Sequence, residues 1–215
     1  MKIFLLILIA IESYLLGGIN GAIIISRFVY GRDIRQYGSG SAGLTNMLRT
    51  FGMLPAGMVL LIDVLKSLVA VLIGAWLFGF VQFPGVGRLF AGFCLMMGHV
   101  FPVYYGFQGG KGVLCGAIMA LLFDWRVGLI CIGAFAVIVF FTRYVSLGSI
   151  LGAAAFPIVT LIFPSHIKTE TILALCCALL LIYMHRSNIS RLISGKESKL
   201  SVGKVSKTED STPPS

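Results

Sequence analysis

The chain of 215 residues is 58% hydrophobic and only 12% charged. A soluble domain carries roughly a quarter charged residues, so this composition all but excludes a soluble globular enzyme and excludes disorder over most of the length. Lys and Arg number 17 against 8 Asp and Glu, a net charge of +9. In a soluble protein this excess would suggest nucleic acid. In a membrane protein it indicates positive-inside topology and attraction to anionic lipid or phosphate, so we expect no nucleic-acid partner.

Hydropathy predicts an all-α membrane protein of about seven short transmembrane helices with Gly-rich loops on the cytoplasmic face. No small-x-small cleavage site ends the apolar run after Met1-Lys2, so we interpret it as a retained first helix. One membrane domain, 1–197, is expected to precede a polar, disordered cytoplasmic tail, 198–215. The expected spans are about 3–26, 53–80, 89–105, 113–123, 127–141, 148–163 and 170–185, of which the fourth is short enough to be re-entrant instead.

Lys and Arg are distributed unequally between the two sides of these spans. Lys66 lies inside the second span, and four others lie on one side, namely Lys2, Arg88, Arg126 and Lys168. The remaining twelve lie on the other side: Arg27, Arg32, Arg35, Arg49, Lys111, Arg143, Arg186, Arg191, Lys196, Lys199, Lys204 and Lys207. The positive-inside rule therefore places the N-terminus outside and the C-terminus in the cytoplasm. The Gly-rich polar segments all lie on that cytoplasmic side, where they can build one site: 38–49, 98–112, 143–149 and 185–197.

The first polar segment, 38–49, has the composition of an anion-binding loop. Its glycines let backbone N–H groups turn toward an anion. Neutral hydrogen-bond donors and a planar guanidinium group suit phosphate. The segment offers both, with Ser39, Ser41, Thr45 and Asn46 as neutral donors and Arg49 as the guanidinium. The alternative is a flexible polar loop whose arginine faces lipid headgroups. The segment is not a Walker A motif, because no Gly-Lys-Ser/Thr follows at the required spacing.

The second polar segment places Lys111 between Gly109, Gly110 and Gly112 at a membrane border. A lysine in this position commonly anchors a helix by reaching the headgroups. An anchor does not need glycines around it, whereas close approach of the backbone to a ligand does, so we favour a phosphate-binding lysine. His99, near the end of the third span, is either a structural histidine or a ligand-binding or catalytic group.

In the third polar segment, His185, Asn188 and Arg191 recur every three residues and share one face if the helix continues. The alternative, a basic juxtamembrane segment that binds anionic lipid, is our interpretation of the lysines that follow it. These are Lys199, Lys204 and Lys207.

Three further charged residues, Asp63, Lys66 and Glu12, lie well inside the expected spans. Asp63 and Lys66 are three positions apart, and because buried charges are costly in lipid we predict that they pair structurally and do not act in catalysis. Glu12, in the first span, has no obvious partner. The five cysteines lie in apolar stretches without metal-ligand spacing, so neither disulfides, a metal nor another cofactor is expected.

Together, the three polar segments resemble the signature motifs of the bacterial acyl-phosphate:glycerol-3-phosphate acyltransferases, small membrane enzymes of phospholipid synthesis. Segment 37–49 is similar to the family's Ser-Gly-Ser-Gly-Asn-x-Gly-Ala-Thr-Asn-x-x-Arg. Segments 98–102 and 107–113 are similar to Gly-His-x-Phe-Pro and Phe-x-Gly-Gly-Lys-Gly-Val, and 185–197 to His-x-x-Asn-Ile-x-Arg-Leu-x-x-Gly-x-Glu. The likeness continues in order and spacing from about 13 to 197. This chain departs from the family pattern at Asn20, Ser41, Ser67, Leu114 and Cys115, which leaves room for an altered substrate or a low-activity paralogue.

The resemblance implies a seven-helix fold in the bacterial inner membrane, with the active site at the cytoplasmic face. It also implies transfer of a fatty acyl group from acyl phosphate to the 1-hydroxyl of glycerol 3-phosphate. On this reaction the residues expected to be catalytic are Ser39, Arg49, Lys111, His185 and Asn188. Those expected to bind substrate are Gly40, Ser41, Gly43, Thr45, Asn46, His99, Gly109, Gly110, Gly112, Ser146, Ser149, Arg191 and Glu197.

A basic pocket suits this reaction because both substrates carry phosphate. Arg49 and Lys111 can neutralise the phosphates, the substrate hydroxyl is the nucleophile, and no acyl-enzyme is needed. His185 or a phosphate oxygen of a substrate is the candidate general base. The expected partners are therefore acyl phosphate, glycerol 3-phosphate and membrane phospholipid.

Other function classes fit the sequence less well. The glycerolipid acyltransferases with a His-x4-Asp motif are not matched, because the residues five positions after the histidines are Tyr104, Thr171 and Ser190. A CDP-alcohol phosphotransferase needs clustered aspartates, and the four here are scattered. A transporter or channel for an anionic solute would suit short, glycine-broken helices, but the chain has no internal repeat and its polar motifs lie on one face. A structural membrane adaptor would not explain the Gly-Gly-Lys-Gly sequence.

Overall fold

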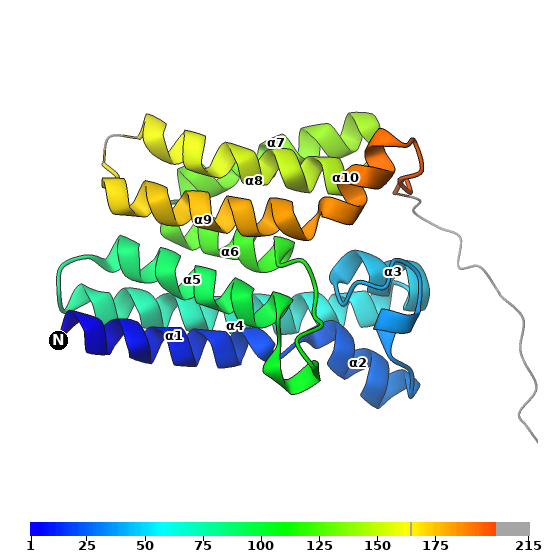
Figure 1. Cartoon of the computed structure of the whole chain (residues 1–215), viewed down its shortest axis with the longest axis horizontal. Helices are drawn as coiled ribbons and strands as arrows, with labels where there is room; N and C mark the ends of the chain where they lie inside the picture. The colour runs from blue at the N-terminus through cyan, green and yellow to red at the C-terminus, as the bar shows by residue number, and fades with distance from the viewer. Residues whose placement is uncertain (164, 201–215) are drawn as a thin grey trace, which may run out of the picture.

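The structure is a computed structural model that describes residues 1–163 and 165–200, and this part of the chain is all-α without strands. Seven helices form a bundle, and shorter helices gather at one of its ends (Figure 1). The bundle helices are α1 (Lys2–Gly18), α4 (Met53–Gly79), α5 (Pro84–Val100), α6 (Val113–Phe123), α7 (Trp125–Thr142), α8 (Val145–Ile162) and α9 (Lys168–Met184). The shorter elements are α2 (Gly21–Tyr30), η1 (Ile34–Gln36), α3 (Leu44–Phe51), η2 (Val103–Tyr105) and α10 (Arg186–Ile193).

Each expected span overlaps a helix of the bundle, which confirms the all-α membrane fold. Within the described residues, five helical stretches are long and apolar enough to cross a bilayer alone. The pair α9 and α10, bent by 58°, adds a sixth if it is one span. Helix α6 has 11 residues, too few to cross unaided. The count of seven spans therefore stays a prediction.

The first expected span, 3–26, is in fact two helices. Helix α1 ends at Gly18, and α2 begins at Gly21 and continues to Tyr30. Asn20 lies at the break and caps α2, because its side-chain oxygen accepts a hydrogen bond of 3.1 Å from the backbone N–H of Ile23. Hydropathy did not reveal this break, since apolar residues continue on both sides of it.

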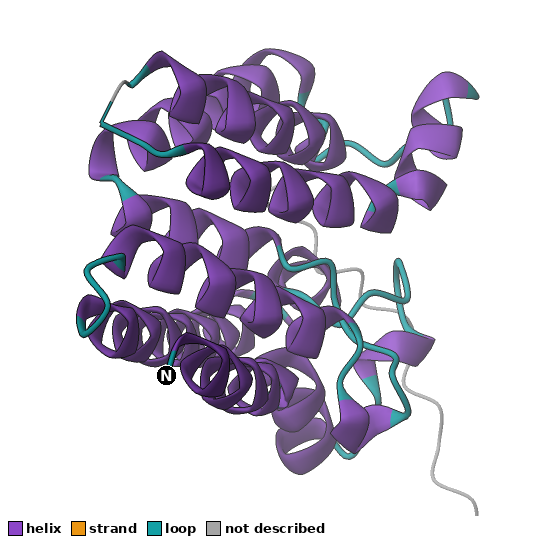
Figure 2. Cartoon of the chain, turned by 60° about the vertical axis from the view of Figure 1, so that its left-hand side comes forward, coloured by secondary structure: helices purple, strands orange, loops and turns teal. Residues whose placement is uncertain are grey.

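The helices pack in two groups joined by a common core. In Figures 1 and 2, α1, α4 and α5 lie together, α7, α8 and α9 lie together, and α6 lies between the two groups. The main core cluster draws on both groups and includes Leu95, Met119, Phe123, Phe156 and Cys177. Helices α4 and α5 approach closely at Gly74 and Gly87, where a side chain on either residue would collide with the opposite backbone. Small residues at such contacts are typical of membrane helices.

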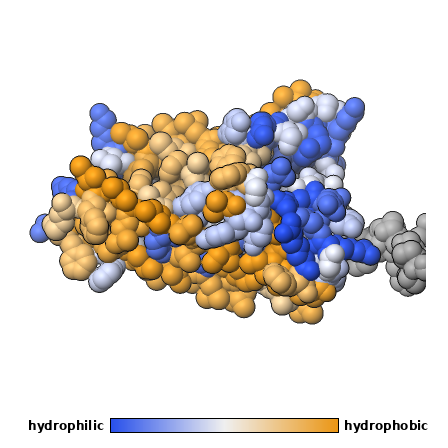
Figure 3. Space-filling view, turned by 60° about the horizontal axis from the view of Figure 1, so that its bottom comes forward, coloured by the Kyte–Doolittle hydropathy of each residue, from blue (hydrophilic) through white to orange (hydrophobic). Residues whose placement is uncertain are grey.

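The two ends of the bundle differ in their connections. One end, the loop end, carries segments 31–43, 101–112, 143–144 and 185–200, at the right of Figure 1. The other end, the turn end, carries the turn 80–83, the junction at Asp124 and the α8–α9 connection. All the Gly-rich segments therefore lie at one end, as predicted. Figure 3 shows that much of the helical surface is hydrophobic, whereas hydrophilic residues concentrate at the loop end.

The start of the expected C-terminal tail contacts the loop end. The backbone N–H of Leu200 donates to the carbonyl of Arg143 at 2.7 Å, and a guanidinium nitrogen of Arg49 lies 3.5 Å from the carbonyl of Ser198. The chain is thus tied to the bundle as far as Leu200. The remainder of the expected tail, 201–215, lies outside the described residues.

Candidate active site

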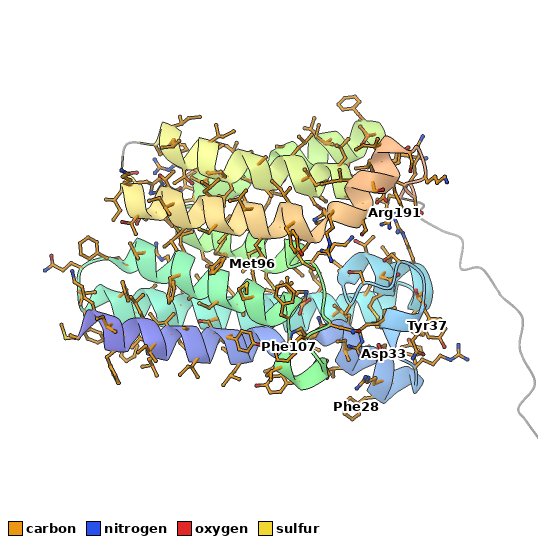
Figure 4. All side chains as sticks on the ribbon, viewed as in Figure 1. Phe28, Asp33, Tyr37, Met96, Phe107 and Arg191 are labelled. Carbon is orange, nitrogen blue, oxygen red and sulfur yellow. The ribbon has the colours of Figure 1, made fainter. Side chains whose placement is uncertain are left out.

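The three polar motifs meet at the loop end from elements that are far apart in the sequence. The first lies in the α2–α3 loop and in α3, the second in the α5–α6 loop, and the third in α10 and the segment after it. Figure 4 places Tyr37 of the α2–α3 loop and Arg191 of α10 at this same end. The geometry of each motif shows which of its side chains are free to bind a ligand.

Asn46 holds the first motif in shape. Its buried amide donates to the carbonyls of Tyr37 and Ser41 at 3.0 Å, and to that of Ile34 at 3.3 Å. Its oxygen accepts a 3.0 Å hydrogen bond from the backbone N–H of Ser39. We predicted Asn46 as a donor to phosphate, but in this structure its amide is fully used inside the loop. A contact with phosphate would require it to release a carbonyl.

The glycines of this motif allow the loop to close around Asn46. Gly38 and Gly40 have φ of +57° and +69°, the left-handed region that favours glycine. A Cβ atom on Gly38 would lie 2.3 Å from the Asn46 side-chain oxygen. Gly43, by contrast, is extended and forms the N-cap of α3. The loop therefore has a fixed shape, which argues against the alternative of a flexible segment.

Several donors of the first motif stay free. Ser39 is exposed, and Ser41 and Thr45 are half-buried. None of the three hydroxyls has a hydrogen-bond partner among the described residues. The half-buried Arg49 has one long contact to the Ser198 carbonyl. These groups can therefore donate to an incoming anion without breaking strong internal bonds.

The glycines of the second motif serve close packing within the chain. A Cβ atom on Gly109 would lie 2.0 Å from the carbonyl oxygen of His99, and one on Gly110 would lie 2.5 Å from that of Ala42. Gly112, with φ of +77°, forms the N-cap of α6. The sequence predicts that these glycines leave room for a ligand. In the structure, Gly109 and Gly110 leave room for neighbouring backbone instead, and direct contact with substrate stays a prediction.

Lys111 reaches from this hairpin to the third motif, where its ammonium donates to the side-chain oxygen of Asn188. Burial lowers the pKa of Lys111, Glu197 raises it, and the charges of Arg191 and Arg49 lower it, so that together they hold it at about 8. A lysine packed in this way does not extend to the headgroups as an anchor. The structure therefore argues against the anchor interpretation, and phosphate binding by Lys111 stays a prediction.

The carboxylate of Glu197 is the centre of the third motif. It accepts hydrogen bonds from Ser146 at 2.7 Å, from Asn188 at 2.7 Å and from Arg191 at 2.8 Å. Burial alone would raise the pKa of the Glu197 carboxylate, but these hydrogen bonds outweigh burial and hold the pKa below its ordinary range. We predicted Glu197 and Ser146 as substrate-binding residues. Here they bind each other, and a carboxylate would repel phosphate, so Glu197 orders the site from within.

The expectation that His185, Asn188 and Arg191 share a face is confirmed for the last two, which both bind Glu197. The helix does not continue, however, because His185 lies at the bend between α9 and α10. Ring atom Nδ1 of His185 lies 2.8 Å from the carbonyl of Leu181. A carbonyl only accepts, so the ring proton lies on Nδ1 and Nε2 keeps its lone pair.

Two further predicted residues are occupied inside the protein. The Ser149 hydroxyl donates to the carbonyl of Val145 in its own helix at 2.9 Å. His99 is buried, and its Nδ1 lies 2.9 Å from the ammonium of Lys66. The structure thus supports the structural alternative for His99. The predicted pairing of Asp63 with Lys66 is confirmed at 2.8 Å.

Arg35 is a residue of this end that the sequence did not single out. Its guanidinium donates to the carbonyls of Tyr105 at 2.9 Å and Gln108 at 3.0 Å, and it pairs with Asp33 at 2.7 Å. Hydrogen bonds from Arg35 lower the pKa of Asp33 well below its ordinary range. Arg35 therefore ties the first motif to the second. The Asp-x-Arg spacing in a polar loop was its only local signal.

The assembled site is strongly cationic. Arg49, Lys111 and Arg191 lie around a single carboxylate, that of Glu197. Free hydroxyls and an imidazole with an unprotonated nitrogen lie at the same end. Among the described residues no group of three or more His, Cys, Asp or Glu could hold a metal ion. This arrangement can bind phosphate anions and accept a proton at His185.

Comparison with known proteins gives consistent results at the level of sequence. A family model described as glycerol-3-phosphate acyltransferase matches residues 7–195. The glycerol-3-phosphate acyltransferase of Thermoanaerobacter sp. (strain X514) is 42% identical over 194 residues, which cover 90% of this chain and 95% of that protein. The protein of the same name from Clostridioides difficile (strain 630) is 40% identical over 204 residues, covering 93% and 98%.

Solved structures with the same architecture are also known. The crystal structure of PlsY (YgiH), an integral membrane glycerol 3-phosphate acyltransferase, in its glycerol 3-phosphate form has a TM-score of 0.82 to this chain at 30% identity. The match covers 91% of this chain and 96% of that one. A second structure of the same protein, in its lysophosphatidic acid form, has a TM-score of 0.79 at 29% identity and covers 91% and 95%.

Proposed function

The chain belongs to the glycerol-3-phosphate acyltransferase family, and on that premise we propose that it transfers a fatty acyl group from acyl phosphate to the 1-hydroxyl of glycerol 3-phosphate. The products are 1-acylglycerol 3-phosphate and inorganic phosphate. That it is a bacterial membrane enzyme acylating glycerol 3-phosphate follows from the family. The donor and the hydroxyl position are the parts that we propose.

One observation supports this reaction above all, namely the excess of cations around Glu197 at the end of an apolar bundle. Acyl phosphate and glycerol 3-phosphate each carry a phosphate dianion. Arg49, Lys111 and Arg191 offer three positive charges against one carboxylate, and the free hydroxyls of Ser39 and nearby residues add neutral donors. Two anions can therefore be held close together without a metal ion.

The proposed reaction proceeds in one step. The 1-hydroxyl oxygen attacks the acyl carbonyl carbon, a new ester C–O bond forms, and the bond from that carbon to the phosphate oxygen breaks. The hydroxyl proton goes to a base, and phosphate leaves with the bonding electron pair. Phosphate is a good leaving group, so charge neutralisation by Arg49 and Lys111 and positioning by Ser39 and Asn188 supply most of the rate enhancement.

His185 is the protein group placed to take that proton. Its Nδ1 donates to Leu181, so Nε2 is available as a base without a change of tautomer. A phosphate oxygen of a bound substrate is the other candidate. Replacing His185 by Gln separates the two, because a substrate base would leave most of the turnover intact.

The apolar bundle suits a donor that stays in the bilayer. We propose that the acyl chain enters between helices while its phosphate reaches the loop end, which faces the cytoplasm by the positive-inside rule. The enzyme would then lie in the bacterial cytoplasmic membrane with its N-terminus outside. The transporter alternative loses its support, because the relatives are named acyltransferases and the polar loops gather at one end.

Phosphate release from the purified protein tests the proposal. We expect release from acyl phosphate only when glycerol 3-phosphate is present, with a matching yield of 1-acylglycerol 3-phosphate. Acyl-CoA and acyl carrier protein thioesters serve as donor controls. Product formation with thioesters alone would contradict acyl phosphate as the donor while leaving the acceptor assignment in place.

A further inference from the structure

Three ionisable side chains are buried behind the loop end and are not used by the proposed reaction. Asp63 and Lys66 belong to α4 and His99 to α5, and their exposed fractions are 2%, 5% and 4%. Charged groups inside a membrane bundle are costly and need a compensating role. Asp63 neutralises Lys66 but does not explain why a charge is present at all.

The contacts of Lys66 show what the charge does. Its ammonium forms an ion pair with Asp63 at 2.8 Å and donates hydrogen bonds to the carbonyls of Gly17 at 3.2 Å and Ile19 at 2.8 Å. These carbonyls lie at the C-terminal end of α1, where a helix leaves its last carbonyls without intrahelical partners and carries a partial negative charge. Lys66 therefore caps α1 and stabilises the break between α1 and α2.

From that break, contacts continue to the first motif. Asn20, the residue after Ile19, caps α2 and also donates its side-chain N–H to the carbonyl of Ala42 at 3.2 Å. Ala42 lies in the loop that Asn46 shapes, directly beside Ser41. The position of the break thus fixes the position of this loop.

A second line of contacts leads from Lys66 to the second motif. An ammonium only donates, so Nδ1 of His99 is the acceptor at 2.9 Å and the ring proton lies on Nε2. The other side of the ring faces Gly110, where an added Cβ would lie 2.3 Å from Nε2. The backbone N–H of Gly110 also donates to the His99 carbonyl at 3.1 Å, and Lys111 is the next residue.

We propose that Asp63, Lys66 and His99 form a positioning cluster that holds the first-motif loop and the Lys111 hairpin in register, so that both face the same phosphates. The two lines of contacts meet at the Ala42 carbonyl, which lies against Gly110. The cluster acts through the loops and does not touch substrate. The expected loss of acyl transfer rests on the proposed function, whereas the expected loosening of the two loops does not.

The test uses the full-length protein with Asp63→Asn and Lys66→Met combined, which removes both charges together and leaves no uncompensated ion in the bundle. Glu12→Gln is the matched control, because it also removes a carboxyl group from a membrane helix, at a site outside both lines of contacts. For the double variant we expect kcat/KM for glycerol 3-phosphate to fall on the order of a hundredfold, with the KM raised. The control should match the unmodified protein.

Hydrogen–deuterium exchange supplies a readout that does not depend on activity. In the double variant, exchange should quicken in segments 38–46 and 105–112 and stay unchanged in the centres of α5 and α8. Exchange that quickens equally throughout, or not at all, would overturn the proposal. If the unmodified protein showed no acyl transfer, the proposed function would fail, and the exchange result would still decide the positioning role.

A second pair of variants covers the case in which the double variant does not fold. His99→Asn keeps an acceptor near the position of Nδ1, whereas His99→Leu removes it. We expect Asn to retain most of the activity and the slow exchange of 105–112, and Leu to lose both. Equal behaviour of the two variants would contradict the role of the Lys66–His99 contact.

Discussion

The two ends of the bundle use charge in different ways. At the turn end both carboxylates have a basic partner: Asp124 pairs with Arg126 at 2.6 Å and lies 3.2 Å from His166, and His166 lies 3.4 Å from Glu170. At the loop end Asp33 pairs with Arg35 at 2.7 Å, but Arg49, Lys111 and Arg191 gather near one further carboxylate, that of Glu197. Contacts of the first kind link neighbouring segments of the bundle, whereas cations that outnumber the carboxylates near them can bind an anionic ligand. The difference cannot be read from the net charge of the chain, and the following variants examine it.

The largest effect is expected for Lys111→Ala. Loss of the ammonium removes a charge that faces phosphate in the proposed transition state, so turnover should fall on the order of a thousandfold. Lys168→Ala, at the exposed start of α9 on the turn end, is the control and should leave turnover unchanged. Steady-state phosphate release measures both. Intact turnover in a folded Lys111→Ala protein would remove the case for charge neutralisation at the loop end.

A smaller loss is expected for Gly110→Ala. The added methyl would lie 2.5 Å from the Ala42 carbonyl, so the hairpin must shift and kcat/KM should fall on the order of a hundredfold. Gly133→Ala is the matched control, because a Cβ atom there meets nothing within 4 Å. Kinetics should be accompanied by thermal unfolding in detergent. Equal activity of the two variants would show that the hairpin tolerates displacement.

The pH dependence of kcat/KM is expected to report on Lys111 at the loop end. Burial lowers the pKa of Lys111 to about 8, and a lysine binds phosphate only when protonated. Therefore kcat/KM should be highest below that pH and fall about tenfold per unit above it. Lys111→Arg should abolish this fall, since a guanidinium stays charged. An unchanged alkaline limb in that variant would assign it to another group.

The smallest effect is expected at the turn end. Asp124→Ala removes the N-cap of α7 and the pairing with Arg126, so the free energy of unfolding should decrease by about 1 kcal/mol with activity unchanged. Hydrogen bonds from Arg126 lower the pKa of Asp124 to about 2. The Asp124 charge therefore contributes fully to the free energy of unfolding above the ordinary pKa of an aspartate, and this contribution is lost as pH falls toward 2. Thermal unfolding at pH 7 and at low pH checks this, and a larger loss at low pH would contradict it.

Features that depend on local sequence were predictable. Long apolar runs predicted the helices, and the spacing of Asp63 and Lys66 predicted their pairing, because each of these features arises within one segment. Because successive loops of a helical bundle alternate between its two ends, the order of the polar loops along the chain also predicted that they share one end. The motifs also named most residues that now surround Glu197. These features needed no knowledge of how the helices pack.

Features that depend on packing between segments were not predictable. Nothing near Gly109 or Gly110 shows that their nearest neighbours would be His99 and Ala42. The resemblance predicts Glu197 as a substrate ligand, and its hydrogen bond with Ser146 could not be foreseen because the two residues lie 51 positions apart. The break at Asn20 was missed for a different reason, since hydropathy reports the environment of a residue and not the continuity of its helix.

The position of the loop end at the border of the apolar surface has a kinetic consequence (Figure 3). On the proposed reaction, glycerol 3-phosphate arrives by diffusion in three dimensions, and the acyl donor by diffusion in the plane of the bilayer. The rate should then depend on the mole fraction of donor in the lipid and not on its bulk concentration. Adding inert lipid at constant total donor would slow the enzyme by surface dilution, without any change in its affinity for glycerol 3-phosphate.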